Sequence, residues 1–216
     1  MPHIKKINFY GDPNIGLYGF ASDSYSLVGN ITKPSQLDVL GVPATSVTIA
    51  NTYLLGIFAA GNSEKIILPD IIREQERRAI EKVADTLALD TRFTAIGNLV
   101  LLNDSGCIIS PLLRRYKSSI EAFLSLPVSV SNIAGLKVVG SAAVCNNNGC
   151  LVHPNTTEKE IEIIESVLGV TTDIGTVNFG SPFVRSGIIV NKNGFLVGDQ
   201  TSGPEAIRMD EVFGFI

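Results

Sequence analysis

Tryptophan is absent from this 216-residue chain, charged side chains make up only 18% of it, and it has no long apolar run. The longest apolar runs, such as residues 99–102, fall far short of the roughly 20 residues that a membrane-spanning helix needs. The first six residues lead into no apolar stretch of the kind that forms a signal peptide. With 20 glycines, 10 prolines and 45% apolar side chains, the composition fits neither a coiled coil nor a disordered chain. We therefore expect a compact, strand-rich cytoplasmic protein with no membrane partner.

Basic residues and cysteines are also too few for several common functions. The 17 Lys and Arg residues against 21 Asp and Glu residues give a net charge of -4. This balance argues against a dedicated duplex-binding protein, because phosphate neutralisation supplies most of that affinity. The three cysteines, Cys107, Cys145 and Cys150, form no CxxC pair, so the sequence supports neither a disulfide framework nor a zinc site. We expect no metal and no cofactor.

The chain is built from five related segments. In residues 95–111 and 138–154 a glycine is followed six residues later by Asn, nine later by Gly and fourteen later by Pro. Weaker copies recur at intervals of 40 to 45 residues along the chain. We call the leading position of each copy its anchor, and the anchors are Gly16, Gly56, Gly97, Gly140 and Arg185.

Each copy predicts two short strands around a tight turn, then a helix, then a short third strand. The Asn-Gly pairs at 148–149 and 193–194 predict type I′ turns, which require positive φ at both central residues. Residues 99–102 and 107–109 are apolar throughout, which indicates strands buried on both faces. The third strand is expected just before the next anchor, at residues 48–51, 132–135 and 176–178.

The helices are marked by local signals. Thr157 with Glu160, and Ser202 with Glu205, have the spacing of capping boxes. Because no single copy could bury its strands and helix alone, the copies must pack on one another, and five of them close most naturally into a ring. We therefore expect residues 1–216 to form one α/β domain of five strand-strand-helix-strand repeats. The anchor glycines would be points of close backbone approach near its axis.

Four stretches together resemble one known family, that of translation initiation factor 6, and its archaeal members most closely. The stretches are residues 95–111, the Gly-Cys-Leu-Val-His-Pro of 149–154, the Gly-Thr-Val-Asn of 175–178, and the ending from Thr201-Ser202-Gly203-Pro204-Glu205 to Ile216. The resemblance implies the pentein fold, a pseudo-fivefold α/β propeller of five blades. It also implies binding to the intersubunit face of the large ribosomal subunit, which prevents premature association with the small subunit, and a role in large-subunit biogenesis.

The resemblance further implies a monomer that contacts ribosomal proteins near the sarcin-ricin loop, with minor contacts to ribosomal RNA. One departure is visible, because Arg185 stands where the family usually has a small residue. Either that blade opens slightly, or the guanidinium points to a wet end of the ring while Gly187 restores the close approach.

Other penteins modify guanidino groups with a cysteine nucleophile, so an enzyme is the alternative function. Cys107 and Cys150 occupy a repeat position that holds Ile66 and Phe195 in other copies, which indicates core packing. Cys145 is interpreted in the same way. His153 lies three residues after Cys150 and would point to the opposite face of a strand, so we expect no catalytic residue. A third possibility, a generic ligand-binding ring, would require a polar central pocket.

Polar residues at the strand ends nearest the anchors are the candidate ribosome-binding residues. They are Asn14, Asn51, Asn98, Ser141, Asn178 and Arg185. The alternative is that they satisfy backbone groups at a crowded axis. Two basic clusters, at residues 73–78 and 114–117, are interpreted as solvated helix faces, with contact to ribosomal RNA as the other possibility.

Overall fold

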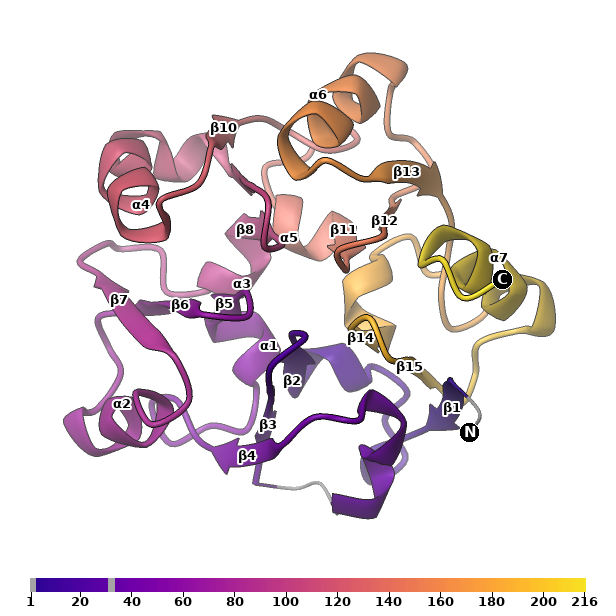
Figure 1. The fold of residues 1–216 in the computed structure, drawn as a ribbon, viewed down its shortest axis with the longest axis horizontal. Helices are drawn as coiled ribbons and strands as arrows, with labels where there is room; N and C mark the ends of the chain where they lie inside the picture. Colours follow the sequence, from indigo (N-terminus) through magenta and orange to yellow (C-terminus); the bar gives the residue numbers. More distant parts are fainter. Residues whose placement is uncertain (1–2, 31–33) are drawn as a thin grey trace.

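A computed structural model describes residues 3–30 and 34–216. These residues form five mixed three-stranded sheets, in agreement with a fivefold repeat (Figure 1). In each sheet the central strand is antiparallel to an inner strand and parallel to an outer one. Four of the sheets follow the chain order: β2 (Gly19–Ala21), β3 (Ser26–Gly29), β4 (Ala44–Val47); β5 (Ala60–Gly61), β6 (Lys65–Pro69), β7 (Asp85–Leu89); β8 (Val100–Leu102), β9 (Cys107–Ile109), β10 (Val128–Val130); β11 (Ala143–Cys145), β12 (Gly149–Val152), β13 (Thr171–Ile174).

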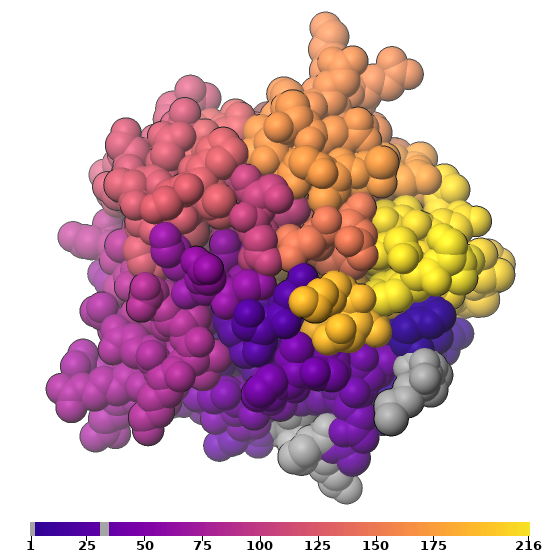
Figure 2. Space-filling model, in the orientation of Figure 1, coloured from indigo at the N-terminus to yellow at the C-terminus, as the bar shows by residue number. Residues whose placement is uncertain are grey.

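The fifth sheet joins the two ends of the chain. Its inner and central strands are β14 (Ile188–Val190) and β15 (Phe195–Gly198), whereas its outer strand is β1 (Ile4–Ile7) from the N-terminus. In the space-filling view the first and last parts of the described chain accordingly lie side by side (Figure 2). The sequence did not predict that a strand from the N-terminus completes the sheet at the C-terminus.

The helices fall into two sets, an outer set and an inner set (Figure 1). The outer set follows the central strands: the 3-10 turns η2 (Pro34–Gln36) and η3 (Asp38–Leu40), α2 (Glu74–Ile80), η4 (Pro111–Tyr116) with α4 (Lys117–Leu124), α6 (Glu158–Leu168) and α7 (Gly203–Val212). The inner set is short and carries the anchors: η1 (Ile15–Leu17), α1 (Leu55–Phe58), α3 (Ile96–Leu99), α5 (Val139–Ala142) and η5 (Val184–Gly187). None of these helices is long and apolar enough to span a bilayer. The inner set was not predicted.

Both predicted capping boxes are confirmed. Thr157 caps α6 and accepts a hydrogen bond from the backbone N–H of Glu160, while the Glu160 carboxylate accepts one from the N–H of Thr157. Ser202 and Glu205 make the same pair of bonds at the start of α7. Each box satisfies N–H groups that the helix itself leaves without partners.

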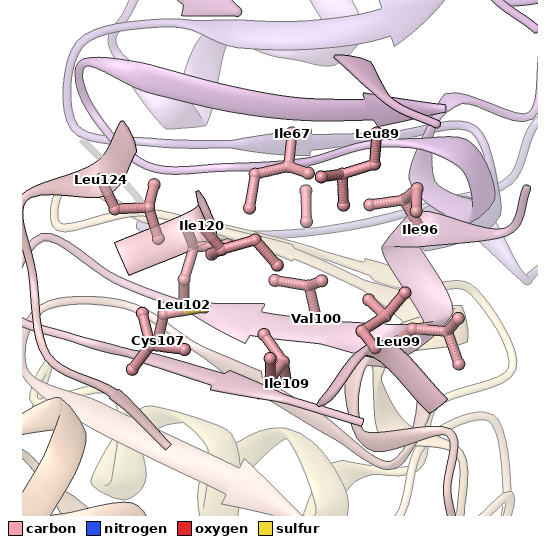
Figure 3. Close-up of a cluster of buried hydrophobic side chains, with 13 residues drawn as sticks. Ile67, Leu89, Ile96, Leu99, Val100, Leu102, Cys107, Ile109, Ile120 and Leu124 are labelled. Carbon is pink, nitrogen blue, oxygen red and sulfur yellow. The ribbon is translucent and has the colours of Figure 1, made fainter. Parts of the chain in front are cut away.

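The apolar strands serve two cores at once. Cys107 and Ile109 of β9 pack into a cluster shared with the preceding sheet, where they join Ile67 of β6 (Figure 3). Ile108, between them, points the other way into a cluster shared with the following sheet, which includes Cys150. Alternate side chains of a strand lie on opposite faces, so a strand between two cores must be apolar at every position. The predicted burial of residues 107–109 on both faces is confirmed.

The anchor glycines are points of close backbone approach, as expected. A Cβ added at Gly56 would lie 1.9 Å from the carbonyl oxygen of Gly16, and one at Gly97 would lie 2.1 Å from that of Gly56. One at Gly140 would lie 2.1 Å from the carbonyl of Gly97, and one at Gly16 would lie 1.9 Å from that of Arg185. No side chain fits in these gaps, so consecutive inner helices pack backbone to backbone.

An asparagine stands six residues after four of the anchors, Gly56, Gly97, Gly140 and Arg185, and links its sheet to the next, whereas Ser22 occupies that position after Gly16. Asn146 is buried; its Oδ1 accepts hydrogen bonds from the N–H groups of Asn148 and Gly149, which closes its own hairpin. Its Nδ2 donates to the carbonyls of Asn191 and Phe213 in the following unit. Equivalent donations run from Asn62 to Asn103, from Asn103 to Asn146 and from Asn191 to Ser22. Each of these amides therefore both stabilises its own hairpin turn and holds its sheet against the next one.

Two local predictions are wrong. The turns at 148–149 and 193–194 contain no positive φ, because Asn146 and Asn191 stabilise them from within. Gly149 is required instead by close packing, since an added Cβ would lie 1.7 Å from the carbonyl oxygen of Val212. The third strands end before the predicted segments, which fold into tight loops with isolated bridges such as Ile49 with Thr52.

Candidate functional site

A cavity of about 210 Å³ opens among the inner helices. The position directly after each anchor contributes to its lining, and these residues are Leu17, Ile57, Asn98, Ser141 and Ser186. Arg185 and Phe183 complete one side of it. The structure therefore brings together three of the predicted site residues: Asn98, Ser141 and Arg185.

Arg185 directs its guanidinium into the axial space. Its Nη2 donates a long hydrogen bond of 3.4 Å to the carbonyl oxygen of Ala59, and its Nε is shielded from solvent without a partner. Burial lowers the pKa of this guanidinium to about 10, which leaves it charged at neutral pH. The sequence suggested that Gly187 restores the close backbone approach at the axis, but the structure does not show this. A Cβ there would meet Val177 and Asn178 of its own unit.

The other three predicted residues are used inside the protein. Asn14 donates to Asp12 at 2.9 Å, and Asn178 donates to the carbonyl oxygen of Pro13 at 3.0 Å. Asn51 is exposed, and its Oδ1 accepts a hydrogen bond from Arg73 at 2.8 Å. Of the three, only Asn178 satisfies a backbone group, as the alternative interpretation expected, whereas Asn14 and Asn51 bond to side chains.

Four tight loops lead from outer strands into inner helices. We call them the junction loops, and they are residues 9–12, 49–52, 133–136 and 177–181. Each contains backbone at positive φ, for example at Tyr10, Ala50, Ala134 and Phe179. The loop at 177–181 runs almost directly into Phe183, which lines the cavity, so the junction loops lie at the cavity end of the molecule.

Glutamates from the outer helices fasten three junction loops. Glu205 of α7 accepts hydrogen bonds from the N–H groups of Phe179 and Gly180, at 3.2 and 2.9 Å, and from the Thr176 hydroxyl at 2.7 Å. Partial burial tends to raise the pKa of Glu205, but these bonds and those from Ser202 outweigh burial and lower it to about 2. Glu76 and Glu160 hold the loops at 49–52 and 133–136 in the same way. The ionised carboxylate thus fixes backbone that would otherwise be strained.

Exposed aromatic side chains stand on or beside these loops. Tyr10 is 87% exposed and Phe179 is 84% exposed, although both are large and apolar. Tyr53 and Phe183 are also exposed, directly after two junction loops. Sequence reasoning missed them. The signal was present as a repeated aromatic-Gly-polar-Pro pattern at residues 10–13 and 179–182.

The cysteines and His153 form no catalytic pair. Cys107 and Cys150 are fully buried, and burial raises the pKa of the Cys107 thiol. His153 accepts a hydrogen bond at Nδ1 from the N–H of Asn155, as a turn histidine does. Cys145 differs from the prediction, because it is only partly buried and lines narrow space along the axis. Within residues 3–30 and 34–216, no cluster of His, Cys, Asp and Glu could hold a metal ion.

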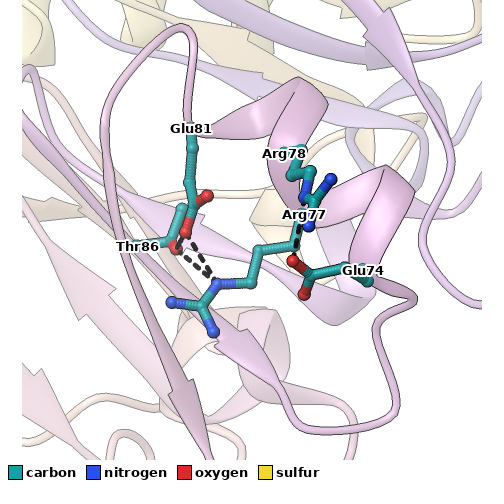
Figure 4. A network of polar contacts seen from close by, with 5 residues as sticks. All are labelled: Glu74, Arg77, Arg78, Glu81 and Thr86. Carbon is teal, nitrogen blue, oxygen red and sulfur yellow. Dashed lines mark hydrogen bonds and ion pairs between the residues drawn. The ribbon is translucent and has the colours of Figure 1, made fainter.

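In the basic cluster at residues 73–78, two of the three arginines are paired within α2, and the third, Arg73, donates a hydrogen bond to Asn51. Arg77 pairs with Glu81 at 2.7 Å and Arg78 pairs with Glu74 at 2.9 Å, both at i,i+4 spacing (Figure 4). The hydroxyl of Thr86, on β7, also donates a hydrogen bond to the Glu81 carboxylate. The cluster is a solvated helix face, and such exposed pairs add little stability.

The hairpin loops close the opposite end of the axis. Each inner strand runs from an inner helix to a hairpin, so the hairpins lie at the far end from the junction loops. Asn147 donates hydrogen bonds to Asp23 at 2.8 Å and to Asp104 at 2.6 Å. Asp104 in turn accepts hydrogen bonds from Ser63. Only about 20 Å³ of space remains among these groups.

Comparison with known proteins gives a consistent result over nearly the whole chain. The sequence profile of the eIF-6 family matches residues 4–212. Translation initiation factor 6 of Haloquadratum walsbyi is 37% identical over 98% of this chain and 96% of its own length. The proteins of the same name from Pyrococcus horikoshii and Methanococcus maripaludis are 34% and 37% identical, and each alignment covers at least 99% of both chains.

Proposed function

Because the chain belongs to the eIF-6 family of non-enzymatic translation factors, we propose that it binds the intersubunit face of the large ribosomal subunit. Bound there, it prevents premature association with the small subunit and takes part in large-subunit biogenesis in the cytoplasm. The partners are ribosomal proteins near the sarcin-ricin loop, with minor contacts to ribosomal RNA. Guanidino-group chemistry has no support, since the two buried cysteines are packing residues.

A closed ring is the framework of this proposal. We infer that residues 1–216 form one five-bladed propeller of the pentein type, with a blade at each anchor. The pairing of β1 with β15 and the asparagine links between successive sheets favour closure. At the seam between the first two sheets, where Ser22 replaces the asparagine, the Tyr25 hydroxyl donates a hydrogen bond to the carbonyl oxygen of Asn62. A ring held in this way is stiff, which suits a protein that acts as a monomer by occupying space.

The junction-loop end is the proposed docking surface, and its exposed aromatics carry the proposal. Aromatic side chains are enriched at the energetic centres of protein interfaces, because they bury much area at little cost in conformational entropy. Tyr10 and Phe179 are exposed on loops that hydrogen bonds hold in place, so little further ordering is needed on binding. Asn98 and Ser141 at the cavity rim belong to the same surface.

The size of the molecule is consistent with steric exclusion. A stable interface buries about 800 Å² on each partner. That is about a tenth of the 9133 Å² of accessible surface, so the rest of the protein stays outside the contact. No cofactor or catalysis is required, because occupancy of the joining surface is itself the mechanism.

Co-sedimentation with large subunits from an archaeon tests the proposal. We expect the wild-type protein to sediment with isolated large subunits and to reduce their association with small subunits in sucrose gradients. The double substitution Tyr10→Ala and Phe179→Ala should weaken binding about tenfold or more, since each removes an exposed anchor. Ile207→Ala is the control, because Ile207 is a large apolar residue on α7 that is 57% exposed and is not part of a junction loop.

Three outcomes would contradict the proposal. If the wild-type protein does not sediment with large subunits, the proposed binding is wrong. If it binds but leaves subunit association unchanged, the proposed steric mechanism is wrong. Equal losses in the Ile207→Ala control and the double variant would show that docking does not use the junction-loop end.

A further inference from the structure

The axial cavity contains a half-buried cation that the protein does not neutralise. The ion pairs within residues 3–30 and 34–216 involve other side chains, and none includes Arg185. Its pKa is lowered by burial, and the lining of the cavity contains no carboxylate. A desolvated charge without a counterion is costly, so this position favours an anion from solution.

The guanidinium also has unused hydrogen-bonding capacity. It carries five N–H donors, yet its one acceptor is the carbonyl oxygen of Ala59 at the long distance of 3.4 Å. The Nε donor is buried without a partner. Native proteins rarely leave such a group unsatisfied. Because Nε is shielded, a ligand in the cavity would bind to the terminal nitrogens, of which Nη1 has no hydrogen-bond partner among the described residues and Nη2 has only the long bond to Ala59.

The remaining lining suits an oxyanion. Asn98 and Ser141 add an amide and a hydroxyl, both of which can donate hydrogen bonds without adding charge. Leu17, Ile57 and Phe183 form apolar walls, which strengthen the attraction between the guanidinium and an anion by excluding water. The cavity of about 210 Å³ has room for several molecules the size of water, at about 30 Å³ each in the liquid.

We propose that this cavity binds a small tetrahedral oxyanion of the phosphate type, held by Arg185 with Asn98 and Ser141 as neutral donors. The planar guanidinium matches two oxygens of such a group, and its hydrogen bonds to an ionised acceptor are the strong ones. The phosphate is either free inorganic phosphate or a phosphate group of RNA. The inference does not depend on binding to the ribosome.

Isothermal titration of the isolated full-length protein tests the site. Inorganic phosphate and a short single-stranded RNA are titrated separately, with potassium chloride holding the ionic strength constant. We expect saturable binding of at least one of them by the wild-type protein, and affinity about tenfold or more weaker for Arg185→Met. Arg78→Met is the matched control, because Arg78 is an exposed arginine on α2 that pairs with Glu74 outside the cavity, and the affinity of this variant should be unchanged.

The outcomes separate the sources of the phosphate and the possible failures. Binding of inorganic phosphate that Arg185→Met abolishes identifies the free ion, whereas binding of RNA alone with the same loss identifies an RNA phosphate. No binding of either probe, or equal binding by wild type and Arg185→Met, would overturn the proposal. If Arg185→Met does not fold, Asn98→Ala and Ser141→Ala serve in its place, with line broadening of the phosphorus resonance as the readout. Ribosomes are absent from these assays, so failure here leaves the docking proposal untouched.

Discussion

Replacement of one buried asparagine should lower the free energy of unfolding of the whole protein, and Asn146→Ala is the clearest test. The side chain accepts two hydrogen bonds, at 2.9 and 2.8 Å, and donates two more, at 3.4 and 3.1 Å. It is only 5% exposed, so water cannot easily replace the lost partners. At about 1 kcal/mol for each net hydrogen bond, and more where a buried group stays unsatisfied, the free energy of unfolding should fall by about 4 kcal/mol.

Urea denaturation followed by far-ultraviolet circular dichroism measures this loss. Asn155→Ala is the control, since Asn155 is exposed in a turn and its replacement should change stability by less than about 0.5 kcal/mol. Asn146→Asp tests separately the acceptor, which stabilises the turn, and the donor, which bonds to the following unit. It keeps the acceptor for the turn but places a carboxylate oxygen against the carbonyls of Asn191 and Phe213, so it should destabilise at least as much as alanine. A loss below about 1 kcal/mol for Asn146→Ala would refute the idea that these amides hold adjacent sheets together.

Three further predictions concern the anchors, the junction loops and the thiols. Gly56→Ala should lower the free energy of unfolding by about 3 kcal/mol or more, because its Cβ would lie 1.9 Å from a backbone oxygen, whereas Gly203→Ala, with nothing within 4 Å, should be tolerated in the same urea denaturation. Glu205 has its folded pKa lowered to about 2 from an ordinary 4.5, so its stabilisation is full above pH 4.5 and is lost as the pH falls toward 2; acid unfolding of Glu205→Gln should lack that dependence. Cys107 and Cys150 should resist thiol reagents until the protein unfolds, as a time course with and without urea will show.

The sequence predicted those features whose cause is local. The capping box at Thr157 depends on a partner three residues away, and the burial of residues 107–109 follows from three consecutive apolar side chains. The anchor glycines were recognised because they recur at regular intervals, and the expectation that close backbone approach requires glycine at these positions is confirmed.

Features with distant causes were missed. Nothing in residues 4–7 indicates that their partner strand begins at Phe195, because register with a distant strand is set by packing that only the fold creates. The turn at 148–149 was predicted wrongly for a related reason. Gly149 is needed for its contact with Val212, and the turn itself is stabilised by Asn146, so an Asn-Gly pair here does not indicate positive φ.

The candidate site was only half predictable. Asn98 and Ser141, which were expected at the strand ends nearest the anchors, lie with Arg185 at one cavity. The same reasoning could not separate them from Asn14 and Asn178, because an amide that already has a hydrogen-bond partner within the protein and one that is available to another molecule look alike in sequence. Only hydrogen-bond geometry distinguishes the two.

The two ends of the axis differ in charge, and this bears on how an acidic protein can dock on a ribonucleoprotein. Asp23 and Asp104 lie at the hairpin end, where Asn147 gathers them. At the opposite end Arg185 has no acidic partner, and the carboxylate of Glu205 is occupied by backbone N–H groups. Glu76, Glu160 and Glu205 also lie at this end, but each is matched by backbone N–H groups of a junction loop. A polyanionic surface would be repelled by Asp23 and Asp104 and attracted by Arg185, so these groups, and not the net charge of -4, would orient the molecule on approach. The docking that we propose, with the aromatic junction loops toward the large subunit, uses this orientation.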